Sequence, residues 1–185
     1  MSEPDAPDDV ATDAAPHKPA ARGGITRLNA PLARACMMAA VGGLFVIVAI
    51  VGYQVFGRYV LNQSPTWAEN LALVLILYVT LIGAAVGVRD AGHVGMESLL
   101  VLLPERWRIR FEVVIHVLVG IFGGAMIYNG WILGESVAGY KLANLGLSEA
   151  VRYAPLVISG ALIILFSIEH IIALRNGTEV EPAWN

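Results

Sequence analysis

Long apolar runs dominate the chain and predict helices that cross a membrane. The first run, 35–57, contains no charged residue over 23 positions. A second begins at Trp67 and is uncharged from 71 to 88, and two more follow nearer the C-terminus. About 20 apolar residues, rising about 1.5 Å each, cross the hydrocarbon core of a bilayer. We therefore expect an all-α membrane protein with four transmembrane helices, over about 35–57, 67–88, 112–134 and 155–174.

Two connectors between these expected helices are longer than tight turns. Residues 93–103 are strongly apolar, but 11 residues are too few to span a bilayer. They predict a short helix lying in the inner membrane interface. Residues 135–153 mix apolar side chains such as Tyr140 and Leu147 with polar ones. They predict an amphipathic connector that packs along the outer membrane surface or against a partner.

The two ends of the chain differ from the 25–175 membrane domain. Residues 1–24 are rich in Ala, Pro and Asp, include five acids and show no apolar periodicity. Such a segment cannot bury enough surface to offset its ordering entropy, so we expect a disordered tail. A signal peptide does not fit, because its apolar core is about 7–15 residues long and the first run here is longer. Residues 176–185 are expected to form a short C-terminal tail.

Basic residues are unevenly divided between the two ends of the expected helices, which predicts the orientation. Cytoplasmic segments of membrane proteins carry an excess of Lys and Arg. With both termini in the cytoplasm, nine basic residues lie inside and three outside. The inner ones are Lys18, Arg22, Arg27, Arg34, Arg89, Arg106, Arg108, Arg110 and Arg175, and the outer ones are Arg58, Lys141 and Arg152.

Composition excludes several classes of function. The chain is 57% hydrophobic and 15% charged, whereas a soluble domain has about 45–50% apolar and about 25% charged residues. One cysteine, Cys36, cannot form an internal disulfide or a zinc site alone. A clustered basic face of the kind that binds nucleic acid is absent from the sequence. Because no nucleophile with a base, paired carboxylates or metal cluster stands out, we expect neither enzyme activity nor a cofactor.

Ionisable residues near the ends of the runs leave several interpretations open. Glu112 and His116, four apart, share a helical face and could hold a metal, but a pair facing headgroups or a neighbouring arginine is favoured. Glu169 is expected to reach the interface or to pair with a basic residue such as Arg110, and a structural role is favoured over ion coupling. His116 and His170 fall at similar depth, so an axial pair for a b-type haem is the alternative, in a membrane anchor of a dehydrogenase.

Other residues within the runs predict contacts between helices. Asn129 and Tyr78 are expected to hydrogen-bond from one helix to another. Glycines four apart let helix backbones approach closely in a membrane. The pairs with this spacing in the second and third runs are Gly83 with Gly87 and Gly120 with Gly124. Together these features favour a scaffold that docks another membrane protein over a self-contained transporter.

Several short motifs lie around the second run and before the fourth. Around the second run the chain reads Arg58, Ser64-Pro65-Thr66-Trp67-Ala68-Glu69, Gly83-Ala84-Ala85 and Arg89-Asp90-Ala91-Gly92-His93-Val94. Before the fourth it reads Tyr140-Lys141, Leu145-Gly146-Leu147 and Tyr153-Ala154-Pro155. Over roughly residues 35–174 this order resembles the DctQ-like small membrane subunit of tripartite ATP-independent periplasmic (TRAP) transporters. Asn70 departs from the pattern, since the family often has a second glutamate there.

The resemblance implies a role in a bacterial inner-membrane complex. It implies two protein partners, a large multi-helix membrane subunit and a periplasmic substrate-binding protein, as well as contact with membrane lipids. Uptake in that family is driven by an ion gradient, commonly sodium, and the substrates are typically organic acids. The small subunit is implied to be a static scaffold that binds neither substrate nor sodium alone.

Eight residues are candidates for partner contact, lipid contact or structural roles. Trp67 is expected to anchor the outer interface, and Arg58 and Glu69 to pair with each other or contact a partner. Arg89 and His93 are expected to cap the second helix and fix the inner interfacial helix. The arginines after Pro104 are expected to reach lipid phosphates. The full set is Arg58, Trp67, Glu69, Arg89, His93, Arg106, Arg108 and Arg110.

Overall fold

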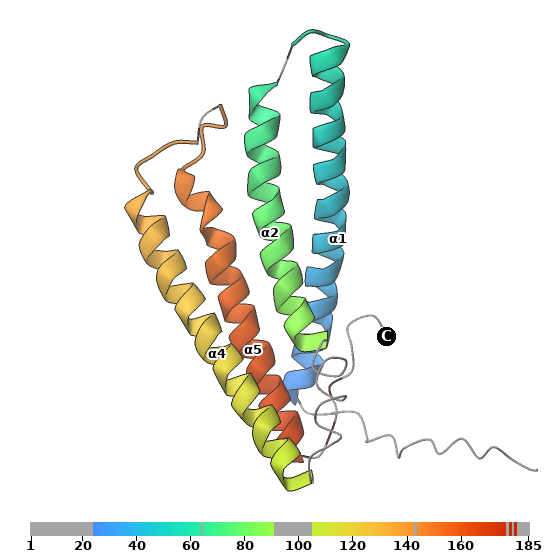
Figure 1. Cartoon of the computed structure of the whole chain (residues 1–185), viewed down its shortest axis with the longest axis vertical. Helices are drawn as coiled ribbons and strands as arrows, with labels where there is room; N and C mark the ends of the chain where they lie inside the picture. Colours follow the sequence, from blue (N-terminus) through green and yellow to red (C-terminus); the bar gives the residue numbers. More distant parts are fainter. Residues whose placement is uncertain are drawn as a thin grey trace, which may run out of the picture.

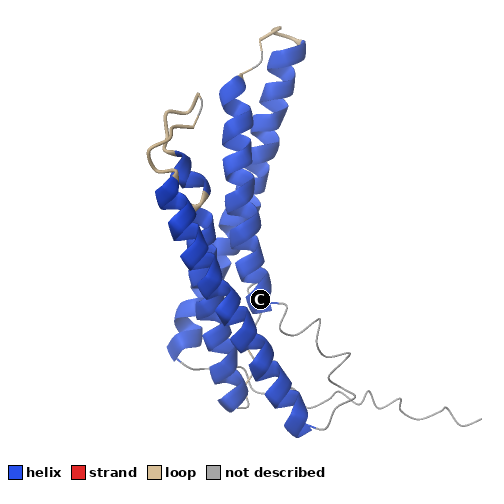
Figure 2. Cartoon of the chain, turned by 60° about the vertical axis from the view of Figure 1, so that its left-hand side comes forward, coloured by secondary structure: helices blue, strands red, loops and turns tan. Residues whose placement is uncertain are grey.

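The computed structural model describes residues 24–63, 65–90, 105–142, 144–176, 178 and 180. Within these ranges every regular element is a helix, and loops occur between the helices (Figure 2). An isolated antiparallel bridge joins Lys141 to Ser148 in the connector before the last helix. The expected interfacial helix over 93–103 and nearly all of the N-terminal tail lie outside the described residues.

Four long helices and one short 3-10 helix make up the described chain. The long helices are α1 (Gly24–Tyr59), α2 (Thr66–Asp90), α4 (Glu105–Ser136) and α5 (Ala154–Asn176), with the 3-10 helix η1 (Glu149–Arg152) before α5. Each long helix is apolar enough over sufficient length to cross a membrane, which confirms the all-α, four-span prediction. The α1 helix begins 11 residues before the expected start at residue 35. The backbone stays helical through the partly polar residues 24–34. These residues were left out of the expected helix because its start was taken from the uncharged apolar run.

The helices pack in the order α1, α2, α5, α4. The α2 helix lies between α1 and α5, and α5 lies between α2 and α4. Figure 1 shows two helical hairpins, α1–α2 and α4–α5, that approach each other at the lower end and diverge toward the upper end. We call the lower end, where α2 and α5 end, the junction end. The upper end, which holds the α1–α2 turn and the connector before α5, is called the hairpin end.

Glycine allows the closest crossing, between α4 and α5. A Cβ atom added to Gly160 would lie 2.6 Å from the carbonyl oxygen of Gly123, and one added to Gly123 would lie 2.8 Å from that of Gly160. Real Cβ atoms do not approach a backbone oxygen this closely, so the crossing requires glycine at both positions. This pair was not among those predicted from spacing.

The predicted glycine pairs do not mediate such crossings within this chain. A Cβ added to Gly83, Gly87 or Gly124 would meet no described atom within 4 Å, and one added to Gly120 makes only an ordinary contact with Ser167. Spacing identifies a face of a helix, but it does not indicate which face turns toward a neighbour. These pairs therefore make no close helix crossing within the described chain, and their use in docking another membrane protein stays a prediction.

The connector before α5 is held against α2 at the hairpin end. The Tyr78 hydroxyl donates to the Val151 carbonyl oxygen at 3.1 Å, which confirms the predicted bond from Tyr78 to another element. Asn144 Nδ2 donates to Thr66 Oγ1 at 3.0 Å. These bonds tie the two hairpins together where their helices diverge.

Asn129 differs from its prediction. Its Nδ2 donates to the Ala125 carbonyl oxygen at 2.7 Å, within α4 itself, and its side chain is exposed. The residue lies away from the face that packs on α5, so it makes no bond between helices in the described chain. The prediction of an interhelical bond was wrong for this residue.

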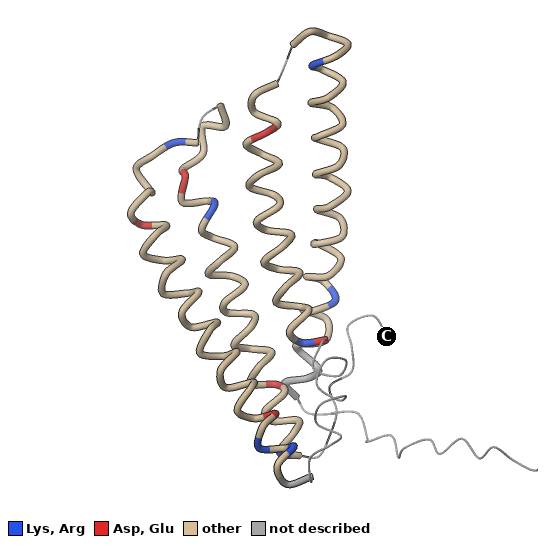
Figure 3. The backbone as a smooth tube through the Cα atoms, viewed as in Figure 1, with Lys and Arg blue, Asp and Glu red and all other residues tan. Residues whose placement is uncertain are grey.

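Charged residues gather at the two ends of the bundle, and the middle of each helix is free of them (Figure 3). Between the ends, large apolar side chains stay exposed, among them Phe45 on α1 (71%) and Phe122 on α4 (61%). In water this exposure would be unfavourable. It is expected where lipid or another membrane protein covers the surface.

Candidate functional site

A buried polar cluster joins all four long helices at the junction end. We call it the ionic junction. Every member is at most 7% exposed. The members are Asn29 on α1, Arg89 and Asp90 on α2, His116 on α4, and Glu169 and His170 on α5.

The carboxylate of Glu169 lies at the centre of the ionic junction. Arg89 Nε donates to its Oε2 at 3.2 Å, and Arg89 Nη2 donates to its Oε1 at 3.4 Å. Asn29 Nδ2 donates to Oε2 at 3.0 Å. The Arg89 guanidinium also lies 6.0 Å from the centre of the Phe166 ring, within range of a cation–π contact. Glu169 is thus both neutralised and hydrogen-bonded, as a buried carboxylate requires.

Arg89 is buried in the ionic junction and is the basic residue that pairs with Glu169. It is 1% exposed, so it does not reach a lipid headgroup. Its Nη1 lies 3.6 Å from Asp90 Oδ1. Glu169 pairs with Arg89 and not with Arg110, because α2 packs directly on the face of α5 that carries Glu169. The expectation that Glu169 pairs with a basic residue is confirmed, and that residue is Arg89, whereas Arg110 had been given as an example.

The two histidines connect α5 to its neighbours on either side. His170 Nε2 lies 2.8 Å from the carbonyl oxygen of Arg89, and because a carbonyl only accepts, Nε2 is the donor. The last carbonyls of a helix have no partner within it, so His170 caps the end of α2. The rings of His116 and His170 stack 4.5 Å apart with their planes 6° from parallel. This stack links α4 to the rest of the ionic junction.

The stacked rings do not support the haem alternative. Two axial histidines place one nitrogen on each side of the iron, so each ring plane contains the line through the metal. Here the rings lie face to face, and Nε2 of His170 is already bonded to α2. In this arrangement the pair cannot ligate one haem from opposite sides.

A metal site is not supported either. Glu112, which shares a helical face with His116, accepts from Arg108 Nε at 3.0 Å. That contact matches the favoured interpretation of a pair with a neighbouring arginine. Among the residues that the structure describes, no group of three or more His, Cys, Asp or Glu side chains could hold a metal ion.

The candidates at the hairpin end lie on the surface. Arg58 and Glu69 are both exposed, and the ion pairs of the described residues do not include one between them. Trp67 is 41% exposed, with its ring 6.1 Å from that of Tyr53. Asn70 accepts from Arg152 Nη2 at 3.4 Å. The neutral amide therefore occupies a position where a glutamate would form an ion pair with Arg152.

The basic candidates on α4 lie near the junction end, outside the ionic junction. Arg108 forms the ion pair with Glu112, and Arg110 lies 5.7 Å from the centre of the Trp107 ring. The side chain of Arg106 and all of His93 lie outside the described residues.

Sequence reasoning missed two members of the ionic junction. Asn29 lies in α1 before the apolar run, where a polar residue gives no signal of burial. Asp90 was quoted only within the motif that begins at Arg89, and no contact was predicted for it. The sequence therefore offers no signal for Asn29, whose burial follows from the length of α1 and from its hydrogen bond to Glu169.

Comparison with known proteins assigns the chain to a family. Residues 47–177 match the family model described as the DctQ component of tripartite ATP-independent periplasmic transporters. The chain belongs to the DctQ family. The match includes every member of the ionic junction except Asn29. With its four apolar helices, this DctQ-family chain is a multi-pass membrane protein and a small permease component of a TRAP transporter.

Two relatives are named as components of sialic acid TRAP transporters. The DctQ-family chain is 27% identical over 130 residues to the sialic acid TRAP transporter small permease protein SiaQ of Vibrio cholerae, covering 70% of this chain and 75% of SiaQ. It is 30% identical over 145 residues to the sialic acid TRAP transporter permease protein SiaT of Haemophilus influenzae. That match covers 77% of this chain and 23% of SiaT.

Proposed function

We propose that this chain is the scaffold subunit of a TRAP secondary transporter, supporting a larger membrane subunit that carries the transport site. The observation that carries the proposal is the placement of buried charge. The buried charged side chains of the described residues, Arg89, Asp90 and Glu169, all belong to the ionic junction. The middle of each helix has no charged residue. Transport sites usually place polar groups near the bilayer midplane, so the site belongs on another subunit.

The match to SiaT supports a larger membrane partner. A segment similar to this chain makes up 23% of that permease, so in SiaT it is covalently joined to a much longer remainder. We propose that the remainder corresponds to a separate membrane subunit here. A periplasmic binding protein delivering an organic acid, and a sodium gradient driving uptake, complete the proposal. Sialic acid, named for both relatives, is the first acid to try.

The proposed placement is the bacterial inner membrane, with the junction end and both termini on the cytoplasmic side. The excess of basic residues at the junction end supports this orientation. Arg106, Arg108 and Arg110 are then proposed to contact lipid phosphates. At the hairpin end, Arg58 and Glu69 are proposed to contact a partner, and Trp67 to anchor the outer interface.

Reconstituted uptake tests the function. Proteoliposomes containing the larger subunit, with and without this chain, receive the binding protein and its labelled acid on the outside. We expect uptake only when both membrane subunits are present and sodium is imposed as an inward gradient. Replacing external sodium by choline is expected to abolish it. Equal uptake without this chain, or uptake by this chain alone, would contradict the scaffold role.

A further inference from the structure

Three buried polar atoms at the junction end have no hydrogen-bond partner among the described residues. They are Nη1 of Arg89 on α2, Nδ1 of His116 on α4 and Oγ of Ser167 on α5. Each of these residues is at most 5% exposed. Nη1 of Arg89 still has the Asp90 carboxylate 3.6 Å away, but neither an ion pair nor a hydrogen bond of the described residues involves the other two atoms. The large majority of buried side-chain polar atoms in proteins bond to protein or to ordered water.

His116 and Ser167 lie on adjacent turns of the packing between α4 and α5. The ring of His116 stacks on that of His170, 4.5 Å away. One turn farther along, a Cβ added to Gly120 would lie 3.8 Å from the Cβ of Ser167 and would meet no other described atom across the interface within 4 Å. Adjacent helical turns are about 5.4 Å apart, and a water about 2.8 Å from each of two polar atoms spans about 5.6 Å. A single water can therefore reach from the level of His116 to that of Ser167.

We propose that an ordered water molecule lies between α4 and α5 at this level and bridges Nδ1 of His116 to the hydroxyl of Ser167. A buried water needs about two to four polar partners, and these two atoms supply the first two. Water and a hydroxyl each donate and accept, so the bridge forms whether Nδ1 carries a proton or a lone pair. Gly120 leaves the hydroxyl uncrowded on the α4 side. The bridge adds hydrogen bonds to the histidine stack that holds α4 against the ionic junction.

A hydrogen bond within α5 does not account for both unpartnered atoms. A serine in a helix can donate to the carbonyl oxygen four residues earlier, which here belongs to Ile163. That bond would use the hydroxyl of Ser167 and leave Nδ1 of His116 buried without a partner, at a cost in stability. A bridging water satisfies both atoms at once, which favours it over the bond within the helix.

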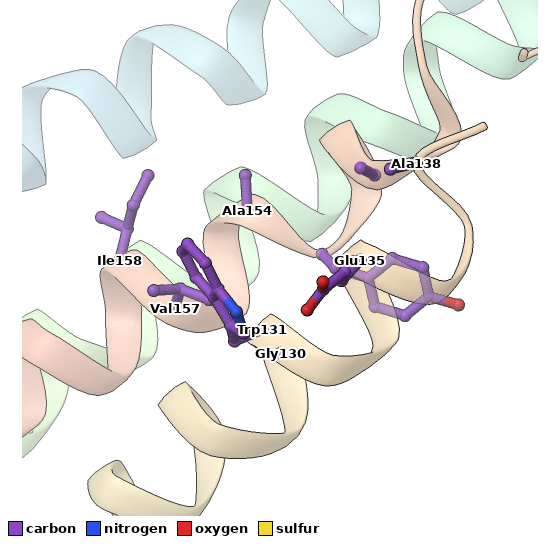
Figure 4. Close-up of a pocket in the computed structure, with 10 residues that line it drawn as sticks. Gly130, Trp131, Glu135, Ala138, Ala154, Val157 and Ile158 are labelled. Atoms are coloured by element: carbon purple, nitrogen blue, oxygen red, sulfur yellow. The ribbon is translucent and has the colours of Figure 1, made fainter. Parts of the chain in front are cut away.

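The same two helices border a different space at the hairpin end. It is an open groove with a volume of about 520 Å³, and Figure 4 shows Trp131 on one wall and Val157 and Ile158 on the other. Its one charged side chain, Glu135, is exposed, and none of the three unpartnered atoms lines it. Within the described interface of α4 and α5, the buried polar atoms that a bridging water requires therefore lie beside the ionic junction.

Hydroxyl-radical footprinting tests for this water. A brief X-ray pulse splits water bound inside the protein, the radical oxidises the side chain beside it, and mass spectrometry locates the oxidised residue. The full chain is used in lipid nanodiscs, together with the subunits that co-purify with it. We expect oxidation of His116 but not of Met126, which is 8% exposed on the same helix and carries an easily oxidised sulfur. Oxidation of both residues, of Met126 alone or of neither would overturn the proposal.

Paired substitutions test the bridge itself. Ser167→Ala should lower the oxidation of His116 severalfold and lower the denaturant midpoint of unfolding in mixed micelles. In a His116→Phe background, which keeps a ring for the stack but has no Nδ1, Ser167→Ala should no longer lower the midpoint. Ser159→Ala is the matched control, since its Oγ donates to the Leu81 carbonyl oxygen at 2.7 Å and its shift should be the same in both backgrounds. Equal shifts for Ser167→Ala in both backgrounds, or, if the double variant does not fold, unchanged His116 oxidation in Ser167→Ala, would overturn the proposal.

Discussion

Arg89→Met is expected to destabilise the folded chain by about 3–5 kcal/mol, because it leaves the buried carboxylate of Glu169 without its cation. The guanidinium of Arg89 donates twice to that carboxylate and is itself buried, so water cannot replace it. The lower stability is measured by an unfolding titration in mixed micelles, monitored by circular dichroism. The Arg89→Met variant should unfold at a lower fraction of denaturant than the unchanged chain.

Two further variants separate the ion pair from the loss of a long side chain. Arg110→Met removes an exposed arginine near the same end of the bundle and should change stability by no more than about 0.5 kcal/mol. The double variant Arg89→Met with Glu169→Met removes both charges, and should be more stable than Arg89→Met alone. Equal stability of the Arg89→Met and Arg110→Met variants would refute the role assigned to the ionic junction.

Gly160→Ala is expected to destabilise the α4–α5 packing by about 1–3 kcal/mol, although alanine is the better helix former. Its Cβ would lie 2.6 Å from the Gly123 carbonyl oxygen, a backbone atom that cannot rotate away. The helices must therefore separate locally and lose contacts along the crossing. The same unfolding titration measures the effect.

Gly124→Ala is the matched control for this crossing. It lies next to Gly123 on α4, but an added Cβ meets no described atom within 4 Å. Only the higher helix propensity of alanine then changes stability, and we expect the free energy of unfolding to rise by up to about 1 kcal/mol. If Gly160→Ala were as stable as Gly124→Ala, the crossing would not depend on glycine.

The number and type of the helices could be predicted from the sequence because apolar length is a local property. Four apolar runs correctly predicted four long helices, and the predicted bond from Tyr78 to another helix is made to the 3-10 helix η1. Helix ends were predicted less well. The α1 helix continues through polar residues before position 35, since backbone hydrogen bonding does not depend on apolar side chains.

The contacts of the ionic junction could not be predicted, because they depend on which helices are neighbours. Glu169 had several arginines at a similar depth, and only the packing of α2 on α5 selects Arg89. The histidine pair shows the same limit. His116 and His170 were correctly placed at one level, but the orientation of their rings, which decides against haem ligation, follows from the crossing of α4 and α5.

The central claim is that this chain is one subunit of a larger membrane complex. The most direct test is purification of a C-terminally tagged chain from its native membranes in mild detergent, with partners identified by mass spectrometry. We predict recovery of a large, very hydrophobic permease in near-equal amount, with no Soret band in the visible spectrum. Recovery of the chain alone, or with a dehydrogenase and a haem spectrum, would contradict the account.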